Sequence, residues 1–143
     1  MTDSRPLRIL LIDDNRHGLD ARRVLLEDLG YQIDTACCGE DGLTEFEKAA
    51  FDLVVTDYVM PGLRGSEVIK RIRTLNASVP IVMLSGYVEK LGLTKEQIGA
   101  DMVLAKGPNE DRDLARSIAR LVKKKPRSES GVRRAQKARG AAV

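Results

Sequence analysis

Short apolar runs alternate with longer amphipathic stretches through most of this sequence, and no other feature limits the fold as strongly. Runs that are apolar throughout are typical of strands covered on both faces, and the stretches between them have the spacing of helices with one buried face. We expect strands at residues 8–13, 31–36, 53–57, 79–85 and 102–105, the second of which alternates as an edge strand does. This order predicts an α/β fold with a five-stranded parallel sheet, doubly wound, with helices on both faces.

The helices between these strands are predicted from apolar residues three or four positions apart. Gly30 ends the first helix, Gly65 opens the third, and Asn109 caps the last, with acids in its first turn. Residues 88–99 predict a short, irregular helix, because Gly92 interrupts it. The residues expected to face the core are Ala21, Val24, Leu25 and Leu29; Leu43, Phe46 and Ala50; Val68, Ile69, Ile72 and Leu75; and Leu114, Ile118, Leu121 and Val122.

The charge distribution separates a body from a tail. From Lys123 onward there are eight Lys or Arg residues and one acid, Glu129, which leaves 16 basic and 20 acidic residues upstream. Residues 126–143 also lack large apolar side chains except Val132 and Val143, so they cannot support a core. We therefore expect an N-terminal lead at 1–6, one domain at 7–125, and a disordered basic tail at 126–143.

Several protein classes are excluded by composition. No run of eighteen apolar residues is present, and the N-terminus lacks the apolar region of a secretory signal, so we expect a cytoplasmic protein that does not enter the membrane. Cys37 and Cys38 are adjacent, no CxxC spacing exists, and the only histidine is His17. These features argue against a zinc site and predict two reduced, half-buried cysteines and a surface histidine.

Polar residues follow four of the five predicted strands. They are Asp13 and Asp14 after the first strand, Asp57 after the third, Ser85 after the fourth and Lys106 after the fifth. Each is ordinary alone, since acids cap helices and lysines are usually solvated. Sites in open parallel sheets form at the carboxyl ends of the strands, however, and here five such residues converge on that end.

With these residues in place, the chain resembles a receiver domain of two-component response regulators over about residues 7–125. The resemblance is carried by Leu11-Ile12-Asp13-Asp14, by Asp57 followed by Met60-Pro61-Gly62, by Leu84-Ser85-Gly86, and by Gly99-Ala100-Asp101 leading to Lys106. It implies a flavodoxin-like fold with strand order 2-1-3-4-5. It also implies a stand-alone signalling protein, since residues 126–143 are too few for a helix-turn-helix domain.

The resemblance implies a chemistry for the convergent residues. Asp57 would take a phosphoryl group from the phosphohistidine of a sensor histidine kinase or phosphotransfer protein, assisted by Ser85 and Lys106. Mg²⁺ would be held by Asp14, by Asp57 and by the backbone carbonyl of Val59, with Asp13 acting through water. Three carboxylates about 4 Å apart repel by roughly 1 to 4 kcal/mol per pair, and a divalent cation removes that cost.

The resemblance also implies the kind of protein this is. It would be no enzyme, but a phosphoacceptor that assists its own phosphorylation and slow dephosphorylation. Phosphorylation would change binding to an output protein that the sequence does not identify. The chain would be a monomer or a weak homodimer, and its basic tail would make at most weak, non-specific contact with polyanions.

Two positions depart from the family pattern. Val103 stands where the family usually has a switching aromatic residue, and Gly107, rather than proline, follows Lys106. Both departures concern the output rather than the phosphorylation. The main alternative is a degenerate receiver that acts as a phosphorylation-independent scaffold, and the complete set of Asp13, Asp14, Asp57, Ser85 and Lys106 argues against it. A phosphatase or a flavin-binding domain of this architecture fits less well, because Val59 replaces a second Asp and no Gly-rich or Ser/Thr-rich loop follows the first strand.

Overall fold

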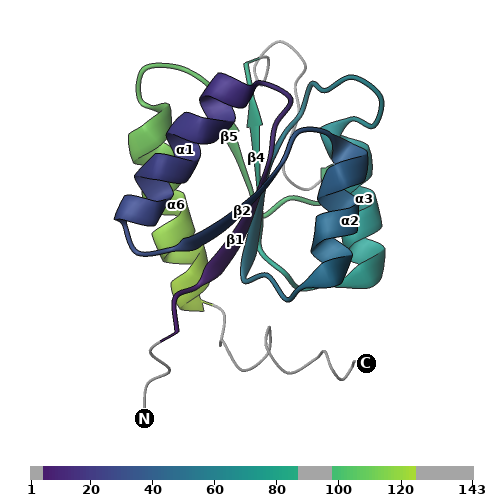
Figure 1. The fold of residues 1–143 in the computed structure, drawn as a ribbon, viewed down its shortest axis with the longest axis horizontal. Coiled ribbons are helices and arrows are strands. Elements are labelled where there is room, and N and C mark those ends of the chain that lie inside the picture. The colour runs from purple at the N-terminus through teal and green to yellow at the C-terminus, as the bar shows by residue number, and fades with distance from the viewer. Residues whose placement is uncertain (1–4, 87–97, 125–143) are drawn as a thin grey trace.

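The computed structural model of the chain describes residues 5–86 and 98–124, drawn in colour in Figure 1. The predicted helix at 88–99 lies almost entirely outside these residues, and the predicted tail at 126–143 lies wholly outside them. In chain order the elements are β1 (Arg8–Ile12), α1 (Arg16–Asp28), β2 (Gln32–Ala36), α2 (Gly39–Lys48), β3 (Leu53–Asp57), α3 (Gly65–Leu75), β4 (Ile81–Ser85), β5 (Met102–Ala105) and α6 (Glu110–Lys124).

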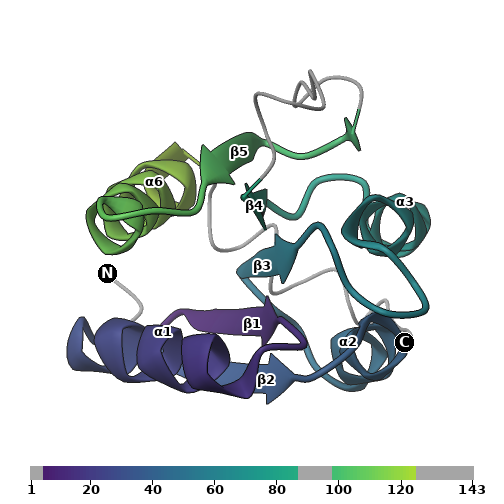
Figure 2. The same ribbon diagram turned by 90° about the horizontal axis from the view of Figure 1, so that it is seen from above.

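The five strands form one parallel sheet in the order β2-β1-β3-β4-β5. The fold class and the strand order are therefore confirmed, with β2 at an edge as its alternation predicted. Figure 2 shows α1 and α6 on one face of the sheet and α2 and α3 on the other. From β1 the chain goes to β2 on one side and then crosses to β3 on the other side of β1, so the order of the strands switches direction between β1 and β3. Folds of this class place their sites at the carboxyl ends of the two strands that flank this switch.

The core lies in two layers, one on each face of the sheet. Leu10, Ile12 and Val54 point toward the layer under α2 and α3, while Ile9 and Leu11 point toward the layer under α1 and α6. Every residue of β3 and of β4 is buried, as expected for central strands covered on both faces. A strand buried throughout can carry a carboxylate only where it ends, which places the Asp57 side chain at the rim.

The predicted buried face of α1 is wrong. Leu19, Arg22 and Leu26 are buried, whereas Val24 is 53% exposed and Leu29 is 54% exposed. Ala21 is exposed as well, and of the predicted residues only Leu25 packs partly against the core. The apolar residues of this helix are spread over more than one stripe, and hydrophobic spacing could not foresee that an arginine occupies the buried one.

The other helix faces are mostly as predicted. Leu75 is 52% exposed at the end of α3, and Ala50 is exposed beyond the end of α2, so these two assignments are also wrong. Both lie at a helix end, where the stripe has already turned away from the sheet. The residues confirmed as buried or as packed against the core are Leu43, Phe46, Val68, Ile69, Ile72, Leu114, Ile118, Leu121 and Val122.

Three smaller expectations can also be compared with the structure. Cys37 and Cys38 are free and partly buried, as predicted, and Cys38 caps α2 by accepting a hydrogen bond from the amide of Asp41. His17 is exposed in the first turn of α1, also as predicted. Within residues 5–86 and 98–124, no helix combines the length and the apolar character needed to cross a membrane.

Candidate functional site

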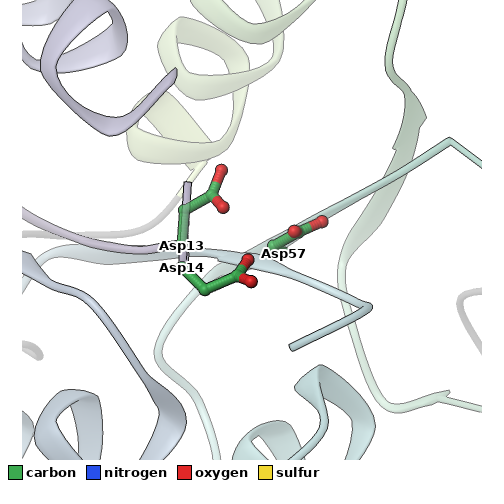
Figure 3. Close-up of side chains that lie close together, drawn as sticks. All are labelled: Asp13, Asp14 and Asp57. Atoms are coloured by element: carbon green, nitrogen blue, oxygen red, sulfur yellow. The ribbon is translucent and has the colours of Figure 1, made fainter. Parts of the chain in front are cut away.

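Three carboxylates gather at the carboxyl ends of β1 and β3. Asp13 and Asp14 directly follow β1, Asp57 ends β3, and each offers an oxygen within 4.8 Å of the others. In Figure 3, Asp13 and Asp14 leave their backbone segment on different sides, and Asp57 comes from the neighbouring strand. Asp13 is 2% exposed and Asp57 is 5% exposed, whereas Asp14 is exposed. The cluster is thus buried on one side and open to solvent on the other.

Asp57 is held by two donors on one oxygen. The amide of Tyr58 donates to Oδ1 at 2.9 Å, and the Lys106 ammonium lies 3.0 Å from the same atom. Burial raises the pKa of the Asp57 carboxyl, and the nearby Asp13 charge raises it further, while hydrogen bonds from Lys106 and Tyr58 only partly offset this rise. The ionised carboxylate is therefore less stable here than in water, which favours a partner that neutralises it.

Asp13 is engaged at both of its oxygens. The amide of Asn15 donates to Oδ1 at 2.9 Å, and the Arg22 guanidinium donates to Oδ2 at 2.5 Å. Lys106 Nζ is 3.9 Å from the same Oδ2. Since both oxygens already accept strong hydrogen bonds, Asp13 is fixed in position more firmly than the exposed Asp14.

The sequence did not identify Arg22 as a site residue. Its side chain is 8% exposed and also pairs with Glu110, in the first turn of α6, at 2.6 Å. A signal was nevertheless present, because Arg22 lies three residues after Leu19 and four before Leu26. When a basic residue is in line with the buried apolar stripe of a helix, and that helix directly follows a pair of acids, an internal ion pair is indicated.

Ser85 and Lys106 reach the same edge of the sheet from β4 and β5. Ser85 is 1% exposed and ends β4, where its carbonyl accepts a hydrogen bond from the Lys106 amide at 3.1 Å. Lys106 directly follows β5, and its side chain is 30% exposed. The structure therefore brings all five predicted strand-end residues to one edge, with Lys106 in contact with Asp57.

The loop after Asp57 is fixed by a close backbone approach. The Gly65 amide donates to the Tyr58 carbonyl at 3.0 Å, and a Cβ at position 65 would collide with the Asp57 carbonyl. Glycine is therefore required where α3 begins, because any larger residue would move the acceptor strand. Val59 lies in this loop and is 51% exposed, and the predicted role of its carbonyl as a metal ligand stays a prediction.

Comparison with known proteins agrees with this geometry, since residues 9–119 match the response regulator receiver domain. The chain belongs to the receiver domain family of response regulators. Receiver domains of this kind accept phosphoryl groups from sensor histidine kinases. The interpretation of the sequence as a receiver domain is thus confirmed at the level of the family.

The matches to curated relatives extend over most of this chain but over only part of each relative. Transcriptional regulatory protein DltR of Streptococcus agalactiae is 34% identical over 114 residues, which are 77% of this chain and 50% of that protein. Sensor protein GacS of Pseudomonas syringae is 36% identical over 80% of this chain and 13% of its own length. This chain therefore spans half or less of the length of these curated relatives.

Two solved receiver domains show the same fold. A receiver domain protein from Methanospirillum hungatei has a TM-score of 0.77 and 28% identity, covering 83% of this chain and 95% of that one. Response regulator TrrA from Thermotoga maritima, solved in complex with Mg(2+)-BeF, has a TM-score of 0.73 and 33% identity, covering 80% and 98%.

The receiver's acidic cluster fits a hard divalent cation. Its donors are carboxylate oxygens from Asp13, Asp14 and Asp57, the ligand type that Mg²⁺ prefers over sulfur or imidazole. The exposed Asp14 leaves an approach from solvent, and the three carboxylates outnumber the two cations, Arg22 and Lys106, that contact them. The residues present therefore suit the ion that the family implies.

The two departures from the family pattern lie away from the acids. Val103 is a partly buried residue of β5 that packs against the core layer under α2 and α3. Gly107 is exposed between Lys106 and Pro108, in the turn that leads to α6. Neither residue supplies a carboxylate of the acidic cluster, so the three acids and Lys106 are all present despite these departures.

Proposed function

We propose that this receiver is a phosphorylatable signalling protein in which Asp57 accepts the phosphoryl group and Mg²⁺ is required. The donor would be the phosphohistidine of a sensor histidine kinase or phosphotransfer protein, and phosphorylation would change binding to an output protein. The observation that carries the proposal is the buried Asp57 carboxylate, 3.0 Å from Lys106 and within the three-acid cluster.

The contacts of Asp57 suggest how its two oxygens would divide the work. Oδ1 accepts hydrogen bonds from the Tyr58 amide and from Lys106, which orients the carboxylate and points to Oδ2 as the attacking atom. A new bond would form between this oxygen and phosphorus while the phosphorus–nitrogen bond to histidine breaks. The imidazole nitrogen would keep the electron pair and then take a proton, so no co-reactant is needed.

The surrounding residues would stabilise charge rather than form bonds. Phosphoryl transfer depends on an in-line nucleophile and on neutralising the equatorial oxygens. Lys106 would turn from Asp57 Oδ1 to one of these oxygens, and the Ser85 hydroxyl would donate to another. When bound to Asp14, Asp57 and the Val59 carbonyl, Mg²⁺ would supply positive charge to the remaining oxygen and relieve the repulsion among the acids.

The direct test is incubation with Mg²⁺ and acetyl phosphate, followed by intact-protein mass spectrometry. We expect one phosphate adduct that is removed by hydroxylamine and absent when EDTA replaces Mg²⁺. Asp57→Asn should abolish the adduct, whereas Asp52→Asn, at the other end of the same strand, should not. A remaining single adduct in Asp57→Asn would identify another acceptor.

The same experiment separates the rival functions. A folded wild-type chain that binds Mg²⁺ but takes no phosphate would favour the phosphorylation-independent scaffold. Continuous release of phosphate over many turnovers would favour a phosphatase.

A further inference from the structure

A buried arginine bridge connects the acidic cluster to α6. The Arg22 guanidinium contacts Asp13 Oδ2 at 2.5 Å and Glu110 Oε2 at 2.6 Å, and its side chain is 8% exposed. Burial by itself would lower the pKa of Arg22, but hydrogen bonds to Glu110 and Asp13 outweigh it, and the pKa is raised. The guanidinium is therefore a permanent charge at the base of the site.

The surroundings of Arg22 are shaped to hold its guanidinium. A Cβ at Gly18, one helical turn earlier in α1, would lie 3.3 Å from the Arg22 Nη1 atom, so the absence of a side chain there leaves room for it. The Asn15 amide holds the other oxygen of Asp13 at 2.9 Å. Asp13 is thus clamped between a backbone donor and a cation, a more defined arrangement than a surface ion pair provides.

The bridge bears directly on Lys106, which lies between two acids. Its Nζ is 3.0 Å from Asp57 Oδ1 and 3.9 Å from Asp13 Oδ2, the same oxygen that Arg22 contacts. Two opposite charges at such a distance attract strongly where water is partly excluded, so an Asp13 without Arg22 would compete for the ammonium. With Arg22 on Asp13, that competition is reduced and Lys106 pairs with Asp57.

We propose that Arg22 is a positioning residue of the phosphoacceptor site, which holds Asp13 and thereby keeps Lys106 on Asp57. Without Arg22, Lys106 moves to Asp13, Asp57 loses its cation, and the cluster gains one unit of negative charge. The effect on phosphorylation rests on the proposed function, whereas the position of Lys106 and the affinity for Mg²⁺ do not.

The principal variant is Arg22→Met, with Arg23→Met as its matched control. Arg23→Met removes the same charge from the same helix, but the Arg23 side chain is 40% exposed, and among the described residues it pairs with acids at 3.6 Å, to Asp20, and at 3.8 Å, to Glu27. In Arg22→Met we expect Mg²⁺ to bind about 3- to 10-fold more tightly by calorimetry, since positive charge is lost near the cluster. At saturating Mg²⁺, the phosphorylation rate should nevertheless fall about 10-fold.

A rise in Mg²⁺ affinity together with a fall in the phosphorylation rate distinguishes a positioning role of Arg22 from damage to the fold. A merely structural role would lower the rate and the Mg²⁺ affinity together, and that result would overturn the proposal. So would equal effects in Arg22→Met and Arg23→Met.

A double-mutant cycle with Lys106→Met tests whether Arg22 acts through Lys106. If it does, Arg22→Met should change the rate less than about 2-fold when Lys106 is already absent. Rate losses that multiply in the double variant would show that Arg22 acts independently of Lys106 and would contradict the proposal.

The last measurement needs neither metal nor phosphate. NMR of the lysine ammonium groups and a crystal structure of metal-free Arg22→Met should show Lys106 nearer to Asp13 than to Asp57. If this variant does not fold, Arg22→Met with Glu110→Met removes both ends of the buried pair and should show the same displacement. Lys106 remaining on Asp57 overturns the inference, whereas a wild-type chain that takes no phosphate overturns only the proposed function.

Discussion

Two arginines tie helices to the sheet at its opposite ends, and their partners differ in kind. Arg73, near the end of α3, donates to the carbonyls of Val79 at 2.6 Å, Gly99 at 3.1 Å and Ala77 at 3.3 Å, and it pairs with Asp101. These residues precede β4 and β5, so Arg73 closes the end of the sheet where the strands begin. Its partners are mainly backbone groups that need a donor in any folded chain.

Arg22 stands at the end where the strands finish, and both of its partners are carboxylates. One of them, Asp13, belongs to the acidic cluster, and no backbone group depends on Arg22 for a hydrogen bond among the contacts of the described residues. From this difference we expect Arg73 to stabilise the fold and Arg22 to organise the acidic cluster.

Arg73→Met should cause the largest loss of stability. It leaves up to three carbonyls and Asp101 without their donor, and Asp101 also holds the Ile81 amide at 2.8 Å. We expect the free energy of unfolding in urea to fall by about 3 kcal/mol, while the Mg²⁺ affinity of the folded fraction stays unchanged. Lys70→Met, an exposed change on the same helix, is the control. A loss below about 1 kcal/mol would remove the structural half of the comparison.

Lys106→Met should have the largest effect on the site with little effect on the fold. Its ammonium is the only cation within 3.0 Å of Asp57 in the described structure, and removing one such donor typically lowers a transfer rate about 100-fold, or about 2.7 kcal/mol. Phosphorylation by acetyl phosphate at saturating Mg²⁺ would be followed by mass spectrometry. An unchanged rate would mean that the Lys106 contact is structural.

Asp57→Asn should stabilise the metal-free protein at neutral pH. The folded-state pKa of Asp57 is raised above its ordinary value of 3.8, by burial first, and the charges facing it are Asp13, Asp14 and Lys106. A raised pKa gives stability that is present below pH 4 and is lost as the pH rises through the folded-state value.

The Asp57→Asn variant carries no charge at this position and avoids that loss. Its free energy of unfolding in urea should therefore exceed that of the wild type by an amount that grows from pH 4 to pH 7 and reaches about 1 kcal/mol. Saturating Mg²⁺ should reduce the difference, because the ion binds the folded wild type better. An advantage that is independent of pH would show that the Asp57 charge is not its cause.

Much of this architecture could be read from the sequence because strands buried on both faces leave little ambiguity. The acids after β1 and β3 and Lys106 after β5 were expected from the strand ends, whereas the strand order was expected from the resemblance to receiver domains. Arg22 was not, since helix spacing ranks residues by hydrophobicity and an arginine scores as exposed unless its partners are known. Those partners are Asp13, nine residues away, and Glu110, 88 residues away, so the buried stripe of α1 is decided by contacts that local periodicity does not contain.

Val103→Tyr should have the smallest effect on the acceptor site and the clearest effect beyond it. Val103 packs partly buried against the core layer under α2 and α3, whereas Arg22, Lys106 and the acids meet at the strand ends. A tyrosine there restores the aromatic residue of the family pattern without touching those groups. We expect the phosphorylation rate to change less than about 2-fold, or about 0.4 kcal/mol, while the difference in partner binding between the phosphorylated and unphosphorylated forms increases. Equal losses of phosphorylation and binding, measured over one acetyl phosphate titration, would show that β5 and the acidic cluster do not act separately.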